Sequence, residues 1–307
     1  MTTRALGPGA GWGWLKQAIN LGSQNPKAIF GAAGLLLVVA LVPTLLQIFV
    51  QQGLGMTDTT VMAGLLVFSV LYSLLVMAPL IAGFLRVIHA AETGAPTRPA
   101  AIFQVFSAGG GALRMIALML LIMVIVLAAV LAIGAAFGGQ FFAGIATAMM
   151  AMSTAAPGST PTLPAMPDGI GAFLALLTLV GLFINGVYAI AVGQVALTGR
   201  SVFGSIGDGF IGTLKNLLPL LVLLVIAIVL MIAFMLLAGL LIALLVFIGG
   251  LVHPMVSIAL AAPVYLGALL VVYVVMFGVI YFMWREICGS DAASPATPVA
   301  AGNQVEM

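Results

Sequence analysis

The sequence predicts an all-α membrane protein, a polytopic bundle of six transmembrane helices with short interfacial helices on its cytoplasmic face. Composition is the first reason. Of the 307 residues, 64% are hydrophobic and only 5% are charged, and the mean hydropathy is +1.34. Ordinary soluble domains carry about 25% charged residues, and this low charge content therefore excludes a soluble domain of this length. The second reason is that the apolar residues gather into six long runs.

Each run reaches the ~20 residues that a helix needs to cross about 30 Å of hydrocarbon. The predicted spans cover about residues 28–50, 60–85, 115–138, 170–197, 217–248 and 255–283. The fifth is too long for an upright crossing and too short for two crossings, so we interpret it as one tilted or extended helix, kinked near Gly239. Pro43, Pro79 and Pro263 lie inside three other spans, where they predict packing kinks, with a gating hinge as the alternative.

The basic residues fix the predicted orientation. All nine fall in alternate gaps between the runs: Arg4, Lys16 and Lys27, then Arg86, Arg98 and Arg114, then Arg200 and Lys215, and finally Arg285. The other gaps, around residues 51–59, 139–169 and 249–254, contain none. By the positive-inside rule, both termini lie in the cytoplasm. We expect 1–288 to form one membrane domain, 139–169 a flexible external loop, and 289–307 a disordered cytoplasmic tail.

Charge and cysteine content exclude further classes. A net charge of +2 is too small to indicate nucleic-acid binding. Cys288 is the single cysteine, so no disulfide can form within the chain. The first apolar run is too long for the core of a signal peptide and is interpreted as a membrane helix.

Three short amphipathic segments precede the first, third and fifth spans, and we expect them to lie in the membrane interface. Their apolar faces comprise Leu15, Ala18, Ile19 and Gly22 in the first segment and Phe203, Ile206 and Phe210 in the third, opposite Ser205 and Asp208. The middle segment, residues 102–106, is less regular. Because each segment and the following hairpin look alike, we predict a threefold repeat over about 13–94, 99–198 and 201–290. Shared constraints on membrane sequences are the alternative origin of the likeness.

Asp, Glu, Lys, Arg and His are absent from the six apolar runs. Such residues usually mark proton relays and ion coupling, so their absence argues against a proton-driven pump and an intramembrane protease. Uncharged polar residues remain: Gln47 in the first span, and Asn185 and Gln194 in the fourth. They favour contacts between helices, and a substrate pathway is the alternative.

Sulfur-bearing residues gather in the predicted external gaps. They are Met56, Met62, Met149, Met150, Met152, Met166 and Met255, beside His253. Thioethers and imidazole suit Cu(I), although methionine also serves as apolar filler, and no metal-ligand spacing repeats. We predict no metal and no cofactor. Trp12, Trp14 and Trp284 flank the first and last spans, where we expect them to act as interface anchors.

Two stretches carry a family resemblance. The first is Gly11-Trp12-Gly13-Trp14-Leu15-Lys16 with Asn25-Pro26 and Val42-Pro43. The second is Ala78-Pro79-Leu80-Ile81-Ala82-Gly83-Phe84 with Glu92-Thr93-Gly94 and Ile102-Phe103-Gln104-Val105-Phe106. Together they resemble an uncharacterised proteobacterial family of six-span inner-membrane proteins, distantly similar to YciC-type proteins and to the membrane domain of some glycerophosphodiester phosphodiesterases. The resemblance implies a bacterial inner-membrane location, and it brings no catalytic residue and no phosphodiesterase domain.

The leading functional hypothesis is a non-enzymatic inner-membrane protein that acts through membrane lipids or protein partners, including a second copy of itself, in the cell envelope. Six basic residues that flank the amphipathic segments are the candidate contacts for anionic headgroups. They are Lys16, Lys27, Arg98, Arg114, Arg200 and Lys215. The alternative is a channel or uncoupled transporter for a neutral or apolar solute, in which Asn185 and Gln194 would line a cavity between kinked helices.

Overall fold

The computed structural model describes residues 3–23, 25–56, 58–153 and 169–289, and all regular structure in these ranges is helical. Nine α-helices occur in them: α1 (Ala10–Ile19), α2 (Pro26–Ile48), α3 (Thr59–Tyr72), α4 (Ala78–Glu92), α5 (Ala112–Ser153), α6 (Ile170–Gly193), α7 (Val202–Lys215), α8 (Leu217–Gly250) and α9 (Pro254–Cys288). Three π-helical turns extend or join them: η1 (Phe49–Gly53), η2 (Ser73–Met77) and η4 (Gln194–Thr198). A short 3-10 helix, η3 (Pro99–Phe106), precedes α5.

Six stretches in the described ranges are long and apolar enough to span a membrane, which confirms the predicted fold class. They are Pro26–Gly53, Thr59–Glu92, Ala112–Gly139, Ile170–Thr198, Leu217–Gly250 and Pro254–Cys288. The second and sixth of these stretches, which end with α4 and α9, continue past residues 85 and 283, where we predicted their apolar runs to end. Their last turns therefore include the ionisable residues Arg86, His89 and Arg285.

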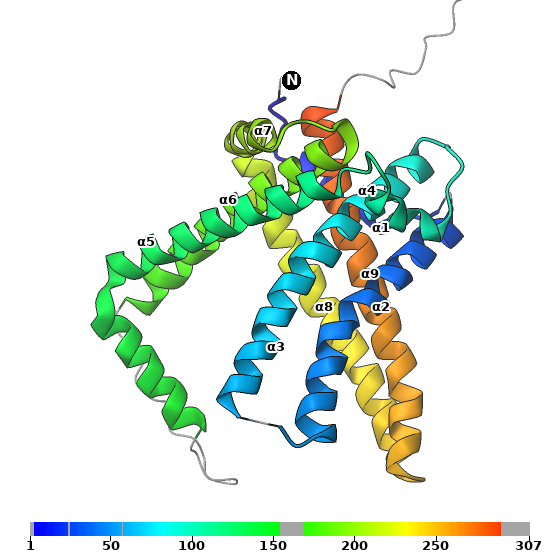
Figure 1. Cartoon of the computed structure of the whole chain (residues 1–307), viewed down its shortest axis with the longest axis vertical. Coiled ribbons are helices and arrows are strands. Elements are labelled where there is room, and N and C mark those ends of the chain that lie inside the picture. The colour runs from blue at the N-terminus through cyan, green and yellow to red at the C-terminus, as the bar shows by residue number, and fades with distance from the viewer. Residues whose placement is uncertain (1–2, 24, 57, 154–168, 290–307) are drawn as a thin grey trace, which may run out of the picture.

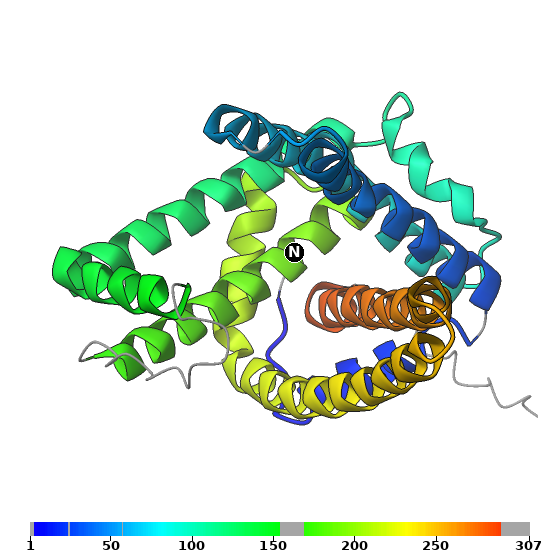
Figure 2. The same ribbon diagram turned by 90° about the horizontal axis from the view of Figure 1, so that it is seen from below.

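The elements follow one another as a short helix and a helical hairpin, three times over. The short helices are α1, η3 and α7, and the hairpins are α2 with α3–α4, α5 with α6, and α8 with α9. Figure 2 shows the three hairpins on three sides of the molecule. This order agrees with the predicted repeat.

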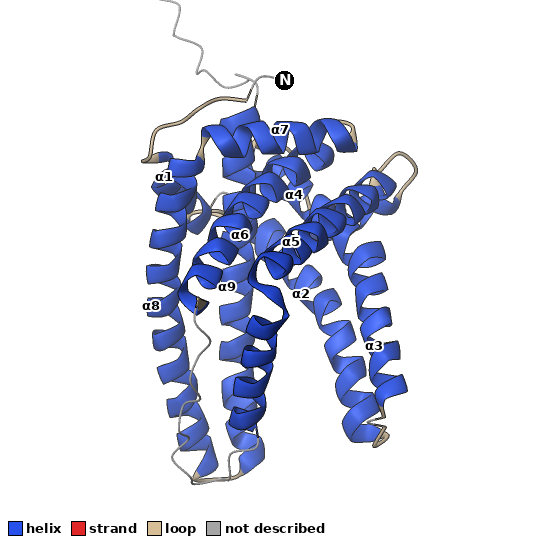
Figure 3. Cartoon of the chain, turned by 90° about the vertical axis from the view of Figure 1, so that its left-hand side faces the viewer, coloured by secondary structure: helices blue, strands red, loops and turns tan. Residues whose placement is uncertain are grey.

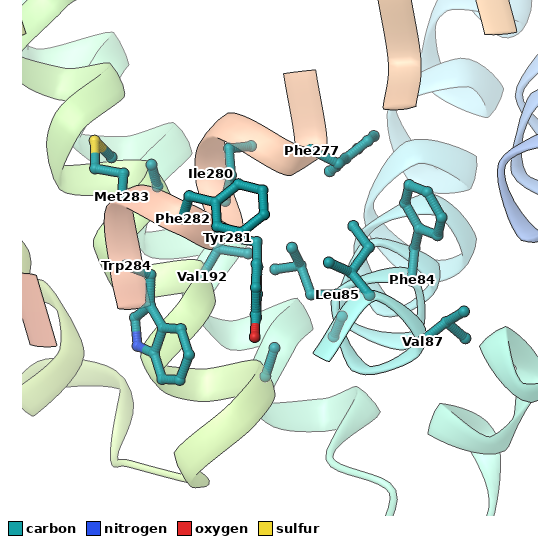
Figure 4. Packing of buried hydrophobic residues seen from close by; sticks show 14 of the residues in the cluster. Phe84, Leu85, Val87, Val192, Phe277, Ile280, Tyr281, Phe282, Met283 and Trp284 are labelled. Carbon is teal, nitrogen blue, oxygen red and sulfur yellow. The ribbon is translucent and has the colours of Figure 1, made fainter. Parts of the chain in front are cut away.

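The core lies at one end of the bundle, where the second helix of each hairpin finishes. Buried side chains concentrate in the last turns of α4, α6 with η4, and α9. Figure 4 shows how Phe84 of α4 meets Phe277 of α9, with ring centroids 5.3 Å apart and nearly perpendicular rings. Gly193 ends α6 directly against Trp284, whose Cβ lies only 2.7 Å from where a Cβ on this glycine would stand. The absence of a side chain at Gly193 therefore lets α6 and α9 pack closely.

The opposite halves of the spans are apolar and exposed. Leu66 of α3 is 67% exposed, and Leu237 and Leu240 of α8 are each 69% exposed. A helix that is apolar on every side belongs in hydrocarbon rather than in water. These faces fit a lipid environment, and Figure 1 shows the hairpins spreading apart toward that end.

Several local expectations are corrected. Helix α8 runs without a break through Gly239, where we expected a kink. Helix α5 instead breaks at Gly138, whose φ of 77° suits glycine, and then resumes as far as Ser153. The predicted external loop 139–169 is therefore helical over its first half, while 154–168 lie outside the described residues. Pro79 lies directly after the π-helical turn η2, which joins α3 to α4, so the helix departs from regular α geometry beside the proline where we predicted a kink. Beyond Gly289, the predicted tail also lies outside the described residues.

Candidate functional site at the basic end of the bundle

The nine basic residues gather at the end of the bundle that contains the core, here called the basic end. The described N-terminal residues also lie there: the Arg4 backbone N–H donates to the Ile287 carbonyl over 2.9 Å. The Asn216 side chain joins this segment to the start of α8, since its Oδ1 accepts from Leu6 N–H at 2.9 Å and its Nδ2 donates to the Arg4 carbonyl at 2.8 Å. Both ends of the described chain thus meet at the basic end (Figure 1).

A polar network joins α1 to α9. The indole N–H of the fully buried Trp14 donates to Glu286 Oε2 over 2.8 Å, and Gln17 Nε2 donates to the other carboxylate oxygen at 2.8 Å. Arg285 in turn donates to Gln17 Oε1 at 2.7 Å and pairs with Glu92 of α4 at 3.6 Å. The network therefore holds three elements together at the basic end.

A second network joins α7 to the end of α6. Asp208 is 7% exposed and forms an ion pair with Arg200. Its carboxylate also accepts a hydrogen bond from Gln194 Nε2 at 3.2 Å, and the Thr198 hydroxyl lies 3.0 Å from Gln194 Oε1. Because Gln194 is fully buried, its amide needs such partners.

Two arginines from other segments bind the carbonyls that end the fourth span. Arg86 Nε of α4 donates to the Ala196 carbonyl at 2.9 Å, and Arg114 of α5 donates to the Gly199 carbonyl at 2.8 Å. Carbonyls at a helix C-terminus have no partner within the helix and carry partial negative charge, so cations stabilise them.

The six predicted headgroup residues divide into two groups. Lys16, Lys27 and Arg98 are exposed, and their side chains form no hydrogen bond or ion pair with the described residues. The other three have protein partners. Arg114 and Arg200 bind as described above, and the Lys215 ammonium donates to the Thr3 carbonyl at 3.0 Å.

The short helices expose aromatic side chains beside these charges. Trp12 of α1 is 45% exposed, Phe103 and Phe106 of η3 are 42% and 48% exposed, and Phe203 and Phe210 of α7 are 81% and 49% exposed. Figure 3 shows α7 lying across the bundle end rather than along the spans.

Helix α7 has the two opposite faces that the sequence predicts, with Phe203 and Phe210 exposed, but its polar face is not exposed to solvent, since Ser205 and Asp208 are buried against the protein. Ile206 of the predicted apolar face is partly buried against the core. Helix α1 differs, since its predicted apolar face is split. Leu15 and Ala18 are buried, but Ile19 is 53% exposed.

Two predicted interface anchors are wrong. Trp14 is fully buried and Trp284 is only 6% exposed, so both belong to the core, and Trp12 alone of the three is exposed. The sequence could not distinguish them by position, because all three tryptophans flank the spans.

The three predicted intramembrane polar residues are not brought together. Gln47 is exposed in the half of α2 that lies away from the basic end. Asn185 is exposed on α6, where its amide donates to the Gly181 carbonyl of the same helix at 2.8 Å. Only Gln194 is buried, within the Asp208 network.

The methionine-rich regions lie at the other end of the bundle, insofar as they are described. Met56 and Met255 are 47% and 67% exposed, Met62 accepts a hydrogen bond from Gln51 at 3.1 Å, and His253 caps α9 by accepting from Met255 N–H at 3.1 Å. Met150 is 71% exposed, and Met166 lies outside the described residues, as do the side chains of Met149 and Met152. The described residues contain no group of three or more His, Cys, Asp or Glu that could hold a metal.

Comparisons with protein-family models, with curated proteins and with solved structures found no match to this chain. The chemistry of the basic end is therefore the basis for proposing a role.

Proposed function

We propose that this membrane protein is non-enzymatic and acts through contacts of its basic end with anionic lipids, or with partners at that surface, in the cell envelope. The observation that supports this role is the pairing of exposed aromatics on the three short helices with exposed cations on or beside them, namely Lys16 on α1, Arg98 just before η3 and Lys215 at the end of α7. Aromatic rings favour the boundary between headgroups and acyl chains, and cationic side chains favour anionic headgroups.

The proposed setting is a bacterial inner membrane with both termini in the cytoplasm. The grouping of all nine basic residues at one end supports this orientation, because the positive-inside rule places such residues on the cytoplasmic side. The same rule explains why the aromatic and basic residues would face the anionic lipids of that leaflet.

The transport alternative has no specific observation in its favour. It predicts that Asn185 and Gln194 line one cavity. In the structure, Asn185 is bonded within its own helix, while Gln194 is bonded to Asp208.

The proposal predicts preferential binding of anionic phospholipid. In native mass spectrometry of the full-length protein, equimolar phosphatidylglycerol and phosphatidylcholine should give several-fold more adducts of the anionic lipid. Replacing the three exposed cations together, Lys16→Gln, Lys27→Gln and Arg98→Gln, should bring this ratio close to one, because it removes the side chains that are free to bind anionic headgroups. The variant should stay folded, since these side chains have no described protein partner to lose. A wild-type ratio of one would refute the proposal.

A further inference from the structure

A cavity of about 590 Å³ opens at the basic end between α4, the connection that follows it, and η3. Its lining is Arg86, Val87 and Ala90 of α4, Pro96, Thr97 and Arg98 of the connection, and Ala101 and Gln104 of η3. The walls are held by close backbone packing. A Cβ on Gly83 of α4 would lie 2.8 Å from the Ile102 carbonyl carbon and closer still to its oxygen, so only glycine lets η3 approach α4 this closely.

The two arginines give this cavity a positive charge that no described carboxylate offsets. Arg86 is half-buried and held through its Nε by the Ala196 carbonyl at 2.9 Å, while Arg98 is exposed. The four acidic residues within the described ranges are engaged elsewhere: Asp58 caps α3, Glu92 pairs with Arg285, Asp208 pairs with Arg200, and Glu286 binds Trp14 and Gln17. The counter-charge for this cavity would therefore come from a ligand.

The chemistry of the lining fits a phosphate ester. Guanidinium groups bind phosphate oxygens in pairs of parallel hydrogen bonds, and this lining contains two of them. Thr97 and Gln104 add uncharged hydrogen-bonding groups of the kind that would suit headgroup hydroxyls.

A second cavity, of about 440 Å³, makes the contrast. It is lined by both Lys16 and Glu92, so opposite charges face it, and it lacks the uniform sign of the first.

The surroundings favour a lipid over a free anion. Phe103 and Phe106, on the same short helix as Ala101 and Gln104, are 42% and 48% exposed. Exposed rings beside a cationic cavity offer an apolar surface to acyl chains next to a site for the headgroup. We propose that this cavity binds the phosphate headgroup of an anionic phospholipid through Arg86 and Arg98. This inference rests on the proposed role in anionic-lipid contact and names its site.

The test measures the dissociation constant of the first bound phosphatidylglycerol by native mass spectrometry of the full-length protein. Arg98→Gln should weaken it about tenfold, the loss of roughly one charge-assisted hydrogen bond. Ala90→Leu should weaken it similarly by filling the cavity without changing charge. Asn20→Ala is the control, an exposed polar residue of the basic end that lies outside this cavity and is not among the headgroup candidates, and it should leave the constant within about twofold of wild type. Arg86→Lys should also weaken binding, because lysine keeps the charge but lacks the fork of donors.

The outcomes separate the two proposals. If the wild type prefers phosphatidylglycerol but Arg98→Gln and Ala90→Leu bind it like the wild type, the cavity is not the site, although the proposed function stands. If the wild type shows no preference, the proposed function fails first. Inorganic phosphate at millimolar concentration should not displace the lipid. Displacement of the lipid by inorganic phosphate at that concentration would assign the cavity to a free phosphate and overturn the lipid assignment.

Discussion

Replacing Gly193 by alanine is expected to lower the stability of the protein by about 1–3 kcal/mol, the usual cost of overpacking a filled core. The new methyl group would stand 2.7 Å from Trp284 Cβ and closer still to the indole ring. Trp284 is only 6% exposed and packs against His89 and Tyr281, with ring centroids 6.3 and 6.1 Å away, so it has little room to retreat. The clash would be relieved only by separating α6 from α9 at the centre of the core.

Thermal unfolding in detergent, followed by intrinsic fluorescence, measures this effect. Gly181→Ala is the matched control on the same helix, because nothing lies within 4 Å of the position of its Cβ. It should unfold at the wild-type temperature or slightly above, since alanine favours helix over glycine. Equal unfolding temperatures for the two variants would show that α6 and α9 do not pack as described.

Replacing Asp208 by alanine is expected to lower the stability of the protein by about 2–4 kcal/mol. This is slightly less than the roughly 3–5 kcal/mol for breaking a fully buried ion pair, because Arg200 is partly exposed. The change removes the ion-pair partner of Arg200 and an acceptor for the fully buried Gln194. Helix α7 would lose its main polar attachment to the end of α6. We expect the variant to unfold at lower temperature and α7 to become sensitive to protease.

Asp208→Asn provides the comparison for that change. Its amide keeps one oxygen acceptor of similar shape while removing the charge, so it should retain part of the lost stability. An Asp208→Ala protein as stable as wild type, with α7 still protected from protease, would be incompatible with the network between α6 and α7.

The features that depend on local pattern were predictable from the sequence. The six spans follow from run length, and the grouping of basic residues follows from their alternation between gaps. The two opposite faces of α7 follow from helical periodicity, whereas the burial of Ser205 against the protein does not.

The features that depend on distant partners were not predictable. Trp12 and Trp14 look alike in sequence, yet residues two apart point to different sides of a helix, and only Trp14 meets Glu286, 272 residues away. The sequence did not distinguish Arg86 from the other eight basic residues, and only the fold shows that it binds the Ala196 carbonyl and lines the cavity with Arg98. The position of Arg86 in the sequence does set it apart, since it directly follows the second apolar run while most other cations lie beside the short helices.

The most direct test is to determine on which side of the membrane the basic end lies. In a Cys288→Ser background, single cysteines would replace Asn20 and Ala95, exposed at the basic end, and Leu54 and Val252, which are 52% and 75% exposed at the other end. Intact bacterial cells with a permeabilised outer membrane are treated with a membrane-impermeant maleimide. We expect labelling at positions 54 and 252, and labelling at 20 and 95 only after the inner membrane is opened. Labelling at positions 20 or 95 in intact cells would contradict a basic end that faces the cytoplasm.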